Sequence, residues 1–122
     1  MLKNKKIGFI GGGNMAEALV NGLVSTSVIN AKSIFVSEPS KSKRDALHAK
    51  YKIKVTSDNH ELVNKCDILI IAVKPQILKV VLCEIRTLLG SDKLVISVAA
   101  GVPISIMDRA LRGDTKKKFS VV

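Results

Sequence analysis

Three consecutive glycines near the start of the chain could bind phosphate. Gly11, Gly12 and Gly13 follow a short apolar run at residues 7–10 and precede a segment with helical spacing. Within them, G-x-G-x-x-A ends at Ala16: the first glycine permits a tight turn, the second lets backbone approach a pyrophosphate, and the alanine lets the helix pack closely. Free N–H groups at the helix start would face the phosphates. The pattern predicts a dinucleotide site, with a ligand-free structural turn as the alternative.

The residues after the second apolar run give opposing signals about which dinucleotide binds. Glu38 ends the run at 33–37 and could accept hydrogen bonds from the adenosine ribose, which favours an unphosphorylated cofactor. Three basic residues follow and could pair with a 2′-phosphate instead. They are Lys41, Lys43 and Arg44. In a third interpretation, Glu38 and the basic residues only open a helix that Ser40 caps. The sequence leaves the three interpretations open.

Two more apolar runs end in small or polar turns. The continuous run at 68–73 ends in Lys74 and Pro75, and the run at 94–98 is followed by 99–101, Ala-Ala-Gly. Proline cannot extend a central strand but suits the first turn of a helix. Because parallel strands end at one edge of their sheet, these turns and the glycines are expected to line one crevice.

The elements that must position these residues alternate regularly. Apolar runs predict strands at 7–10, 33–37, 53–56, 68–73, 94–98 and from 119, and helical patterns lie at 15–24, 40–51, 58–65, 76–89 and 103–111. The capping-box spacing of Asp58 and Glu61 marks the start of the third helix. This order predicts an α/β fold, a doubly wound parallel sheet of the Rossmann type with helices on both faces.

The periodic apolar residues predict which helix faces are buried. In the first helix they are Met15, Ala16, Leu19, Val20, Leu23 and Val24; in the fourth they are Ile77, Val80, Val81, Ile85, Leu88 and Leu89.

Length and composition favour one domain without a membrane span. The 122 residues are 47% apolar, with one Tyr, three Phe and no Trp, which suits strands covered on both faces. No apolar run is long enough to cross a bilayer and the start lacks a secretory h-region, so we expect a cytoplasmic protein.

Cys66 and Cys83 lack metal or redox spacing and are predicted to be reduced, with no metal bound. His48 and His60 are predicted to be solvated.

The net charge of +10 raises the question of nucleic acid. The basic residues are spread along the chain, however, and only 116–118 form a run. Phe9 and Phe35 fall in predicted buried strands, so stacking aromatics are nearly absent. We therefore expect no nucleic-acid partner and read the charge as solvation and as a favourable field for an anionic ligand.

Three segments in this order resemble one enzyme family. GFIGGGNMAEAL, AVKPQ and SVAAGV are similar to the N-terminal domain of pyrroline-5-carboxylate reductases. The resemblance covers nearly the whole chain. It implies reduction of a cyclic imine by hydride from NADPH or NADH, in the last step of proline biosynthesis.

The resemblance also implies a set of cofactor contacts. Gly11, Gly13, Asn14 and Met15 would hold the pyrophosphate, Ser37 and Glu38 would face the adenosine ribose, and Asn59 would reach the cofactor from the third helix. Ala72, Val73, Lys74 and Pro75 would pass the nicotinamide ribose, and Ala99, Ala100 and Gly101 would border the nicotinamide. No catalytic residue is assigned, because a positioning or electrostatic role suits Lys74 better than a catalytic acid role.

The resemblance also predicts what this stretch would lack. In the family, a helical C-terminal domain follows, which forms the homo-oligomer and most of the imine site. Residues 1–122 would then be the nucleotide domain alone, binding cofactor with little turnover, because proximity supplies much of the rate. Two alternatives stay open: the nucleotide domain of another reductase, such as a β-hydroxyacid dehydrogenase or a deazaflavin-linked NADP oxidoreductase, and a noncatalytic nucleotide-sensing or interaction module.

Overall fold

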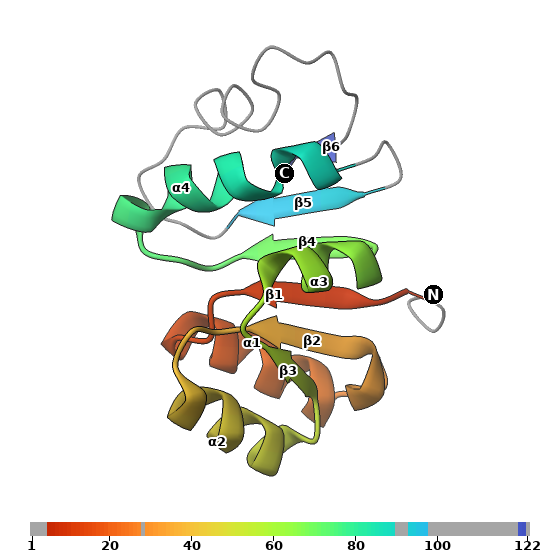
Figure 1. Ribbon diagram of the computed structural model, residues 1–122. Helices are drawn as coiled ribbons and strands as arrows, with labels where there is room; N and C mark the ends of the chain where they lie inside the picture. The colour runs from red at the N-terminus through yellow and green to blue at the C-terminus, as the bar shows by residue number, and fades with distance from the viewer. Residues whose placement is uncertain (1–4, 28, 90–92, 98–119, 122) are drawn as a thin grey trace.

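A computed structural model describes residues 5–27, 29–89, 93–97 and 120–121 of the chain (Figure 1). In this part of the chain, six parallel strands form one sheet in the order β3-β2-β1-β4-β5-β6. The strands are β1 (Ile7–Ile10), β2 (Ile34–Ser37), β3 (Lys54–Thr56), β4 (Ile68–Ile71), β5 (Leu94–Ser97) and β6 (Ser120–Val121). The predicted α/β fold with a doubly wound parallel sheet is confirmed.

Among the described residues, four helices cover the sheet. They are α1 (Asn14–Ser25), α2 (Lys41–Tyr51), α3 (Asn59–Lys65) and α4 (Pro75–Ile85), with short 3₁₀ turns η1 (Ala31–Ser33) and η2 (Arg86–Leu88). The helix predicted at 103–111 lies outside the described residues. In the part of the chain that the structure describes, no helix has the length and apolar character needed to span a membrane.

Alternating side chains divide the core into two clusters, one on each face of the sheet. In β1, Ile7 and Phe9 join the cluster that contains residues of α1 and α2. Ile10 joins the opposite cluster, which contains residues of α3 and α4. Phe9 and Phe35 are both buried, as predicted. A strand covered on both faces needs apolar residues at successive positions, which explains the unbroken apolar runs.

The strand register brings the ends of five strands to one level. The last residues of neighbouring strands are paired: Thr56 with Ser37, Ser37 with Ile10, Ile10 with Ile71, and Ile71 with Ser97. Every loop that follows one of these strands therefore starts at the same edge of the sheet, on the left in Figure 1. This edge is where open α/β sheets bind ligands.

The predicted helix starts are largely confirmed. Ser40 is the N-cap of α2, and Asp58 caps α3 by accepting the backbone N–H of His60 at 2.9 Å. The second half of the predicted capping box does not form. The Glu61 carboxylate instead accepts the hydroxyl of Thr56 at 3.3 Å, and that hydroxyl accepts the Asp58 N–H at 3.1 Å.

Two elements end more than one residue away from the predicted position. The fourth strand ends at Ile71 rather than at residue 73, because its neighbour β1 turns away into the glycines after Ile10; one further bond joins the Ala72 N–H to the Ile10 carbonyl at 2.9 Å. The helix predicted at 76–89 starts at Pro75 and is α-helical only to Ile85, after which η2 tightens the chain.

The predicted buried faces of α1 and α4 were partly wrong. Met15 and Leu19 are 54% and 39% exposed, and Ile77 and Val80 are 49% and 65% exposed. On α4 the buried residues are Leu78, Val81, Leu82 and Ile85. Apolar residues cover more than one stripe of α4, so periodicity alone could not select the face that packs on the sheet.

Candidate functional site

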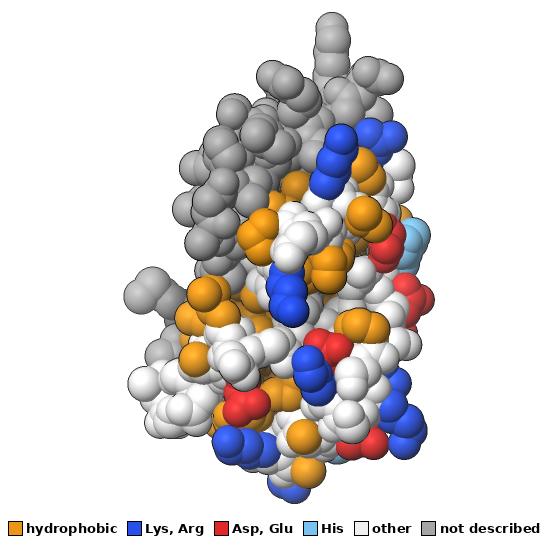
Figure 2. All heavy atoms as spheres, turned by 90° about the vertical axis from the view of Figure 1, so that its left-hand side faces the viewer, with side chains coloured by type: hydrophobic (Ala, Val, Ile, Leu, Met, Phe, Trp, Pro, Cys, Tyr) orange, Lys and Arg blue, Asp and Glu red, His pale blue; other side chains and the backbone are white. Residues whose placement is uncertain are grey.

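A cleft of about 430 Å³ lies at the strand ends. Figure 2 looks onto this side of the molecule, where hydrophobic side chains are exposed between lysines and acidic residues. Eight of the predicted cofactor residues line the cleft: Gly11, Gly13, Ser37, Glu38, Asn59, Ala72, Val73 and Lys74. Loops that are far apart in the sequence thus meet in one place.

Other predicted residues lie beside the cleft or outside the described part of the chain. Asn14, Met15 and Pro75 are exposed residues in the first turns of α1 and α4 and do not line it. Ala99, Ala100 and Gly101 follow β5 in the sequence and fall among the residues that are not described.

Several lining residues were missed by sequence reasoning. They are Ile10, Pro39, Ser57, Ile77, Val80, Val81 and Glu84. Gly12 and Lys43 also line the cleft; the first was expected there as part of the glycine turn, and the second was considered as a phosphate partner or as part of a helix start. The signal for Ile77 and Val80 was present, since they lie three apart in the first turns of a helix that begins at the cleft. Their spacing was read as core.

Gly11 makes the turn out of β1 possible. Its backbone φ is +105°, a conformation that residues other than glycine rarely adopt. A Cβ added there would lie 2.6 Å from the backbone oxygen of Ala72. Its N–H donates to the Ser37 carbonyl at 2.8 Å, so the glycine also joins the loops after β1 and β2.

Gly13 differs, because the protein itself does not require a glycine there. Its φ is −77° and an added Cβ would meet nothing within 4 Å. The start of α1 has no side-chain cap, so its first N–H groups are open to a ligand. An open space beside the backbone at an uncapped helix start fits the pyrophosphate of a dinucleotide.

The Glu38 carboxylate is held by backbone groups. Oε1 accepts the Gly12 N–H at 3.1 Å and Oε2 accepts the Ser40 N–H at 2.8 Å. The residue is only 7% exposed, although part of it lines the cleft.

The three basic residues after Glu38 have different roles. Arg44 donates to the carbonyls of Glu38 and Pro39, at 2.7 and 2.9 Å. Lys41 pairs with Asp45 at 3.2 Å on the surface of α2. Lys43 alone of the three lines the cleft, and no partner for its ammonium is found among the described residues. Most of this segment thus follows the helix-opening interpretation.

The starts of α3 and α4 complete the cleft. The Ser37 hydroxyl donates to Oδ1 of Asn59, which ties the end of β2 to the first residue of α3. Lys74 is the N-cap of α4, and its carbonyl accepts the N–H groups of Ile77 and Leu78 at 2.9 and 3.2 Å. The Lys74 side chain is exposed, which leaves it free to meet an anionic group.

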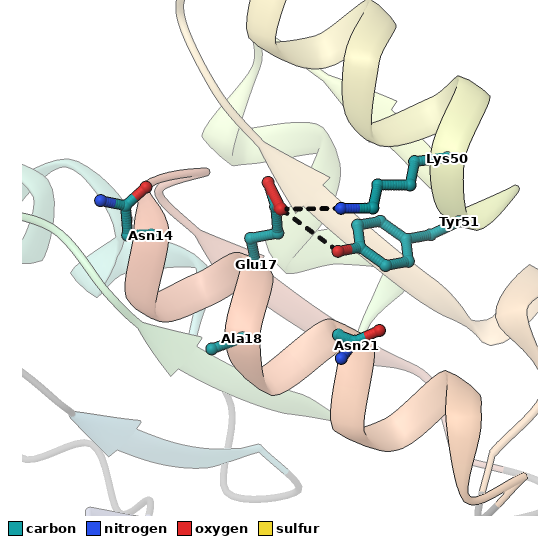
Figure 3. Close-up of a pocket in the computed structure, with 6 residues that line it drawn as sticks. All are labelled: Asn14, Glu17, Ala18, Asn21, Lys50 and Tyr51. Atoms are coloured by element: carbon teal, nitrogen blue, oxygen red, sulfur yellow. Dashed lines mark hydrogen bonds and ion pairs between the residues drawn. The ribbon is translucent and has the colours of Figure 1, made fainter.

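A second hollow of about 260 Å³ lies between α1 and α2 (Figure 3). There the Glu17 carboxylate accepts the Tyr51 hydroxyl at 3.2 Å and pairs with the Lys50 ammonium at 3.5 Å. Tyr51 and then Glu17 raise the pKa of Lys50 above its ordinary value. These contacts join two helices on the same face of the sheet.

The cysteines and histidines offer no reactive group in the cleft. Burial raises the pKa of the Cys66 thiol to about 12, so it stays protonated at neutral pH. Cys83 is exposed, and both cysteines are free, as predicted. His48 and His60 are both exposed, as predicted, and Nδ1 of His48 also lies 2.8 Å from the Ile53 carbonyl. Among the described residues no cluster of His, Cys, Asp or Glu could hold a metal ion.

The parallel sheet, the glycine turn and the cleft at the strand ends define a dinucleotide-binding α/β protein. Residues 6–101 match the family model described as "NADP oxidoreductase coenzyme F420-dependent". The chain belongs to this family of oxidoreductases.

Three relatives place the chain more closely. It is 43% identical over 115 residues to the pyrroline-5-carboxylate reductase of Methanosarcina acetivorans, covering 94% of this chain and 43% of that protein. The structure of the pyrroline-5-carboxylate reductase from Coxiella burnetii superposes with a TM-score of 0.86 at 33% identity, covering 93% of this chain and 42% of that one. The Plasmodium falciparum pyrroline carboxylate reductase with NADP bound gives a TM-score of 0.80 at 34% identity, covering 93% and 40%.

These comparisons confirm the resemblance to pyrroline-5-carboxylate reductases. The chain spans less than half the length of the relatives that it matches.

Proposed function

We propose that this chain is the NADPH- or NADH-binding part of a pyrroline-5-carboxylate reductase. The observation that carries the proposal is the open space at Gly13, beside an uncapped helix start, in a chain 43% identical to such an enzyme. A glycine at a helix start without a side-chain cap leaves room for a ligand to lie against the backbone.

We expect each part of the cofactor to contact a different set of residues at the strand ends. The N–H groups at the start of α1 would hold the pyrophosphate, with Gly13 at the contact. The adenosine ribose would lie over Ser37, and the nicotinamide ribose along 72–74. Residues 99–101 follow the strand beside β4 and would border the nicotinamide. The remaining proposed contacts are Asn14 and Met15 with the pyrophosphate, Pro75 with the nicotinamide ribose, and Asn59 with the cofactor from the start of α3.

The reduced nicotinamide, when bound, supplies the hydride that reduces the carbon of the imine. The residues of this chain bind the cofactor, fix the face that it presents and keep water from it. A protonated imine is cationic and attracts hydride, so the chain needs to supply alignment more than a reactive group. Lys74 would act on the cofactor by its charge.

Lys43 supports NADPH as the cofactor. It is the basic residue after β2 that lines the cleft without a partner among the described residues, and a lysine there would pair with the 2′-phosphate. The bound NADP in the P. falciparum relative agrees with this choice.

The family description favours a second candidate, hydride exchange between NADP and coenzyme F420. One experiment separates the two functions. The protein that carries this chain should oxidise NADPH when pyrroline-5-carboxylate is added, followed by the loss of nicotinamide absorbance. Oxidation that requires oxidised coenzyme F420 and ignores the imine would contradict our proposal.

A cytoplasmic location and a homo-oligomer complete the proposal. Cell fractionation tests the first. Light scattering on the protein that carries this chain tests the second, and a monomer at assay concentration would contradict it.

A further inference from the structure

Glu38 connects the two loops that flank the adenosine side of the cleft. Its two carboxylate oxygens accept two backbone N–H groups, one from Gly12 in the glycine loop and one from Ser40 at the start of α2. The Glu38 N–H donates to the carbonyl of Thr56 at 2.9 Å, and Arg44 donates to the Glu38 carbonyl. The residue is thus bonded through its backbone and its side chain.

Packing holds the side chain in this position. A Cβ added to Gly12 would lie 3.1 Å from both Cβ and Cγ of Glu38, which shows how closely the loop backbone approaches it. Bonds from N–H groups to a carboxylate are stronger than neutral ones. Gly12 is buried, so without Glu38 its N–H would lose the only partner that the structure gives it.

From this geometry we propose that Glu38 is a positioning residue, which fixes the glycine loop against the start of α2 and does not choose between NADH and NADPH. The proposal rests on the proposed function, because it assumes that the cofactor lies in this cleft. A selecting carboxylate must offer its oxygens to the ribose hydroxyls. Here each oxygen already accepts one internal N–H, which holds the carboxylate against the protein, and 7% exposure leaves little of the residue for a ligand.

The two roles predict different binding constants for Glu38→Gln. A carboxamide has one acceptor oxygen and turns an NH₂ donor toward the second N–H. If Glu38 positions the loop, the Kd of NADH and the Kd of NADPH should both rise by about tenfold, with their ratio constant within about twofold. If Glu38 selects the cofactor, NADH should weaken while NADPH does not, and the ratio should shift by about tenfold or more.

The experiment is calorimetric titration of the wild type and Glu38→Gln with each cofactor, at a temperature where circular dichroism shows both to be folded. The matched control is Asp45→Asn, which removes one negative charge from exposed α2 surface. It should leave both Kd values within about twofold. If the wild type binds neither cofactor, the proposed function fails; if it binds and the ratio shifts in Glu38→Gln, only the positioning role fails.

Amide hydrogen exchange of the wild type gives an independent test that does not depend on the variant. The Gly12 and Ser40 amides should exchange at least about tenfold more slowly than those of exposed loop residues such as Ser57. Exchange at the rate of an open loop would overturn the proposal. In Glu38→Gln, the Gly12 amide should lose this protection while the amides of β1 keep theirs.

Discussion

The two walls of the cleft are built differently. The glycine wall, Gly11–Gly13 with Ser37 and Glu38, is tied together by hydrogen bonds between its own loops. The apolar wall, Ile77, Val80 and Val81 of α4, presents side chains of which Ile77 and Val80 are 49% and 65% exposed. One wall has its polar groups arranged before a ligand arrives, and the other offers apolar surface.

This difference separates two tasks. Charged phosphates and sugars need donors in fixed positions, and groups fixed in advance need little reorganisation on binding. A planar ring needs contact area more than fixed donors, and exposed apolar side chains provide it. Substitutions in the glycine wall should therefore change stability, cofactor affinity or both strongly, whereas those at the exposed positions of α4 should have small effects on stability.

The largest effect is expected for Gly11→Ala. A positive φ of 105° and a backbone oxygen 2.6 Å from the new Cβ should lower the free energy of unfolding by about 3 kcal/mol. Urea denaturation measures the change. A loss below about 0.5 kcal/mol would show that the loop after β1 does not need this turn.

The two faces of α4 should respond differently to truncation. Leu82→Ala empties a buried position and should cost about 3 kcal/mol, whereas Val80→Ala removes side-chain atoms that are mostly solvated and should cost less than about 0.5 kcal/mol. Urea denaturation of both variants tests this. Equal losses in the free energy of unfolding would mean that the Val80 side chain is buried and that the apolar wall belongs to the core.

Gly13→Ala should separate binding from folding. The new methyl group has room in the protein, so the free energy of unfolding should change by less than about 0.5 kcal/mol. It projects where the pyrophosphate would lie, so the Kd of either cofactor should rise at least tenfold, or about 1.4 kcal/mol. Gly22→Ala, also without neighbours within 4 Å but within α1, is the control and should leave both Kd values unchanged. Unchanged Kd values for Gly13→Ala would show that the pyrophosphate does not bind at this loop.

Lys43→Gln gives the smallest expected effect. It tests the proposed phosphate contact of Lys43 on α2, beside the glycine wall. The Kd of NADPH should rise about fivefold, because an exposed phosphate contact is worth roughly 1 kcal/mol, and the Kd of NADH should stay within twofold. Lys41→Gln is the matched control, since Lys41 pairs with Asp45 instead. Equal weakening of both cofactors by Lys43→Gln would contradict the phosphate contact.

The sequence was informative about the fold because its signals were local and redundant. The continuous run at 68–73 is typical of a strand covered on both faces, and Pro75, two residues after it, suits the first turn of the helix that follows. The glycine turn had a strand before it and a helix after it. Ser40 and Asp58 marked helix starts by the chemistry of their side chains.

The rest depended on contacts between residues distant in sequence. Whether Glu38 faces a ribose or the Gly12 N–H is decided by the distance between two loops, which no local pattern contains. Likewise, the orientation of α4 depends on which of its apolar stripes fits the sheet, so Ile77 and Val80 were assigned to the core. The same reasoning found Lys43 but could not separate it from Lys41, because their difference lies in the pairing with Asp45.

The most direct test of the central claim is calorimetric titration of this chain with NADPH and with NADH. We predict saturable binding of at least one cofactor, with a Kd below about 1 mM. Absence of binding by both cofactors at that concentration, in a sample that circular dichroism shows to be folded, would contradict the assignment of this cleft as a dinucleotide site.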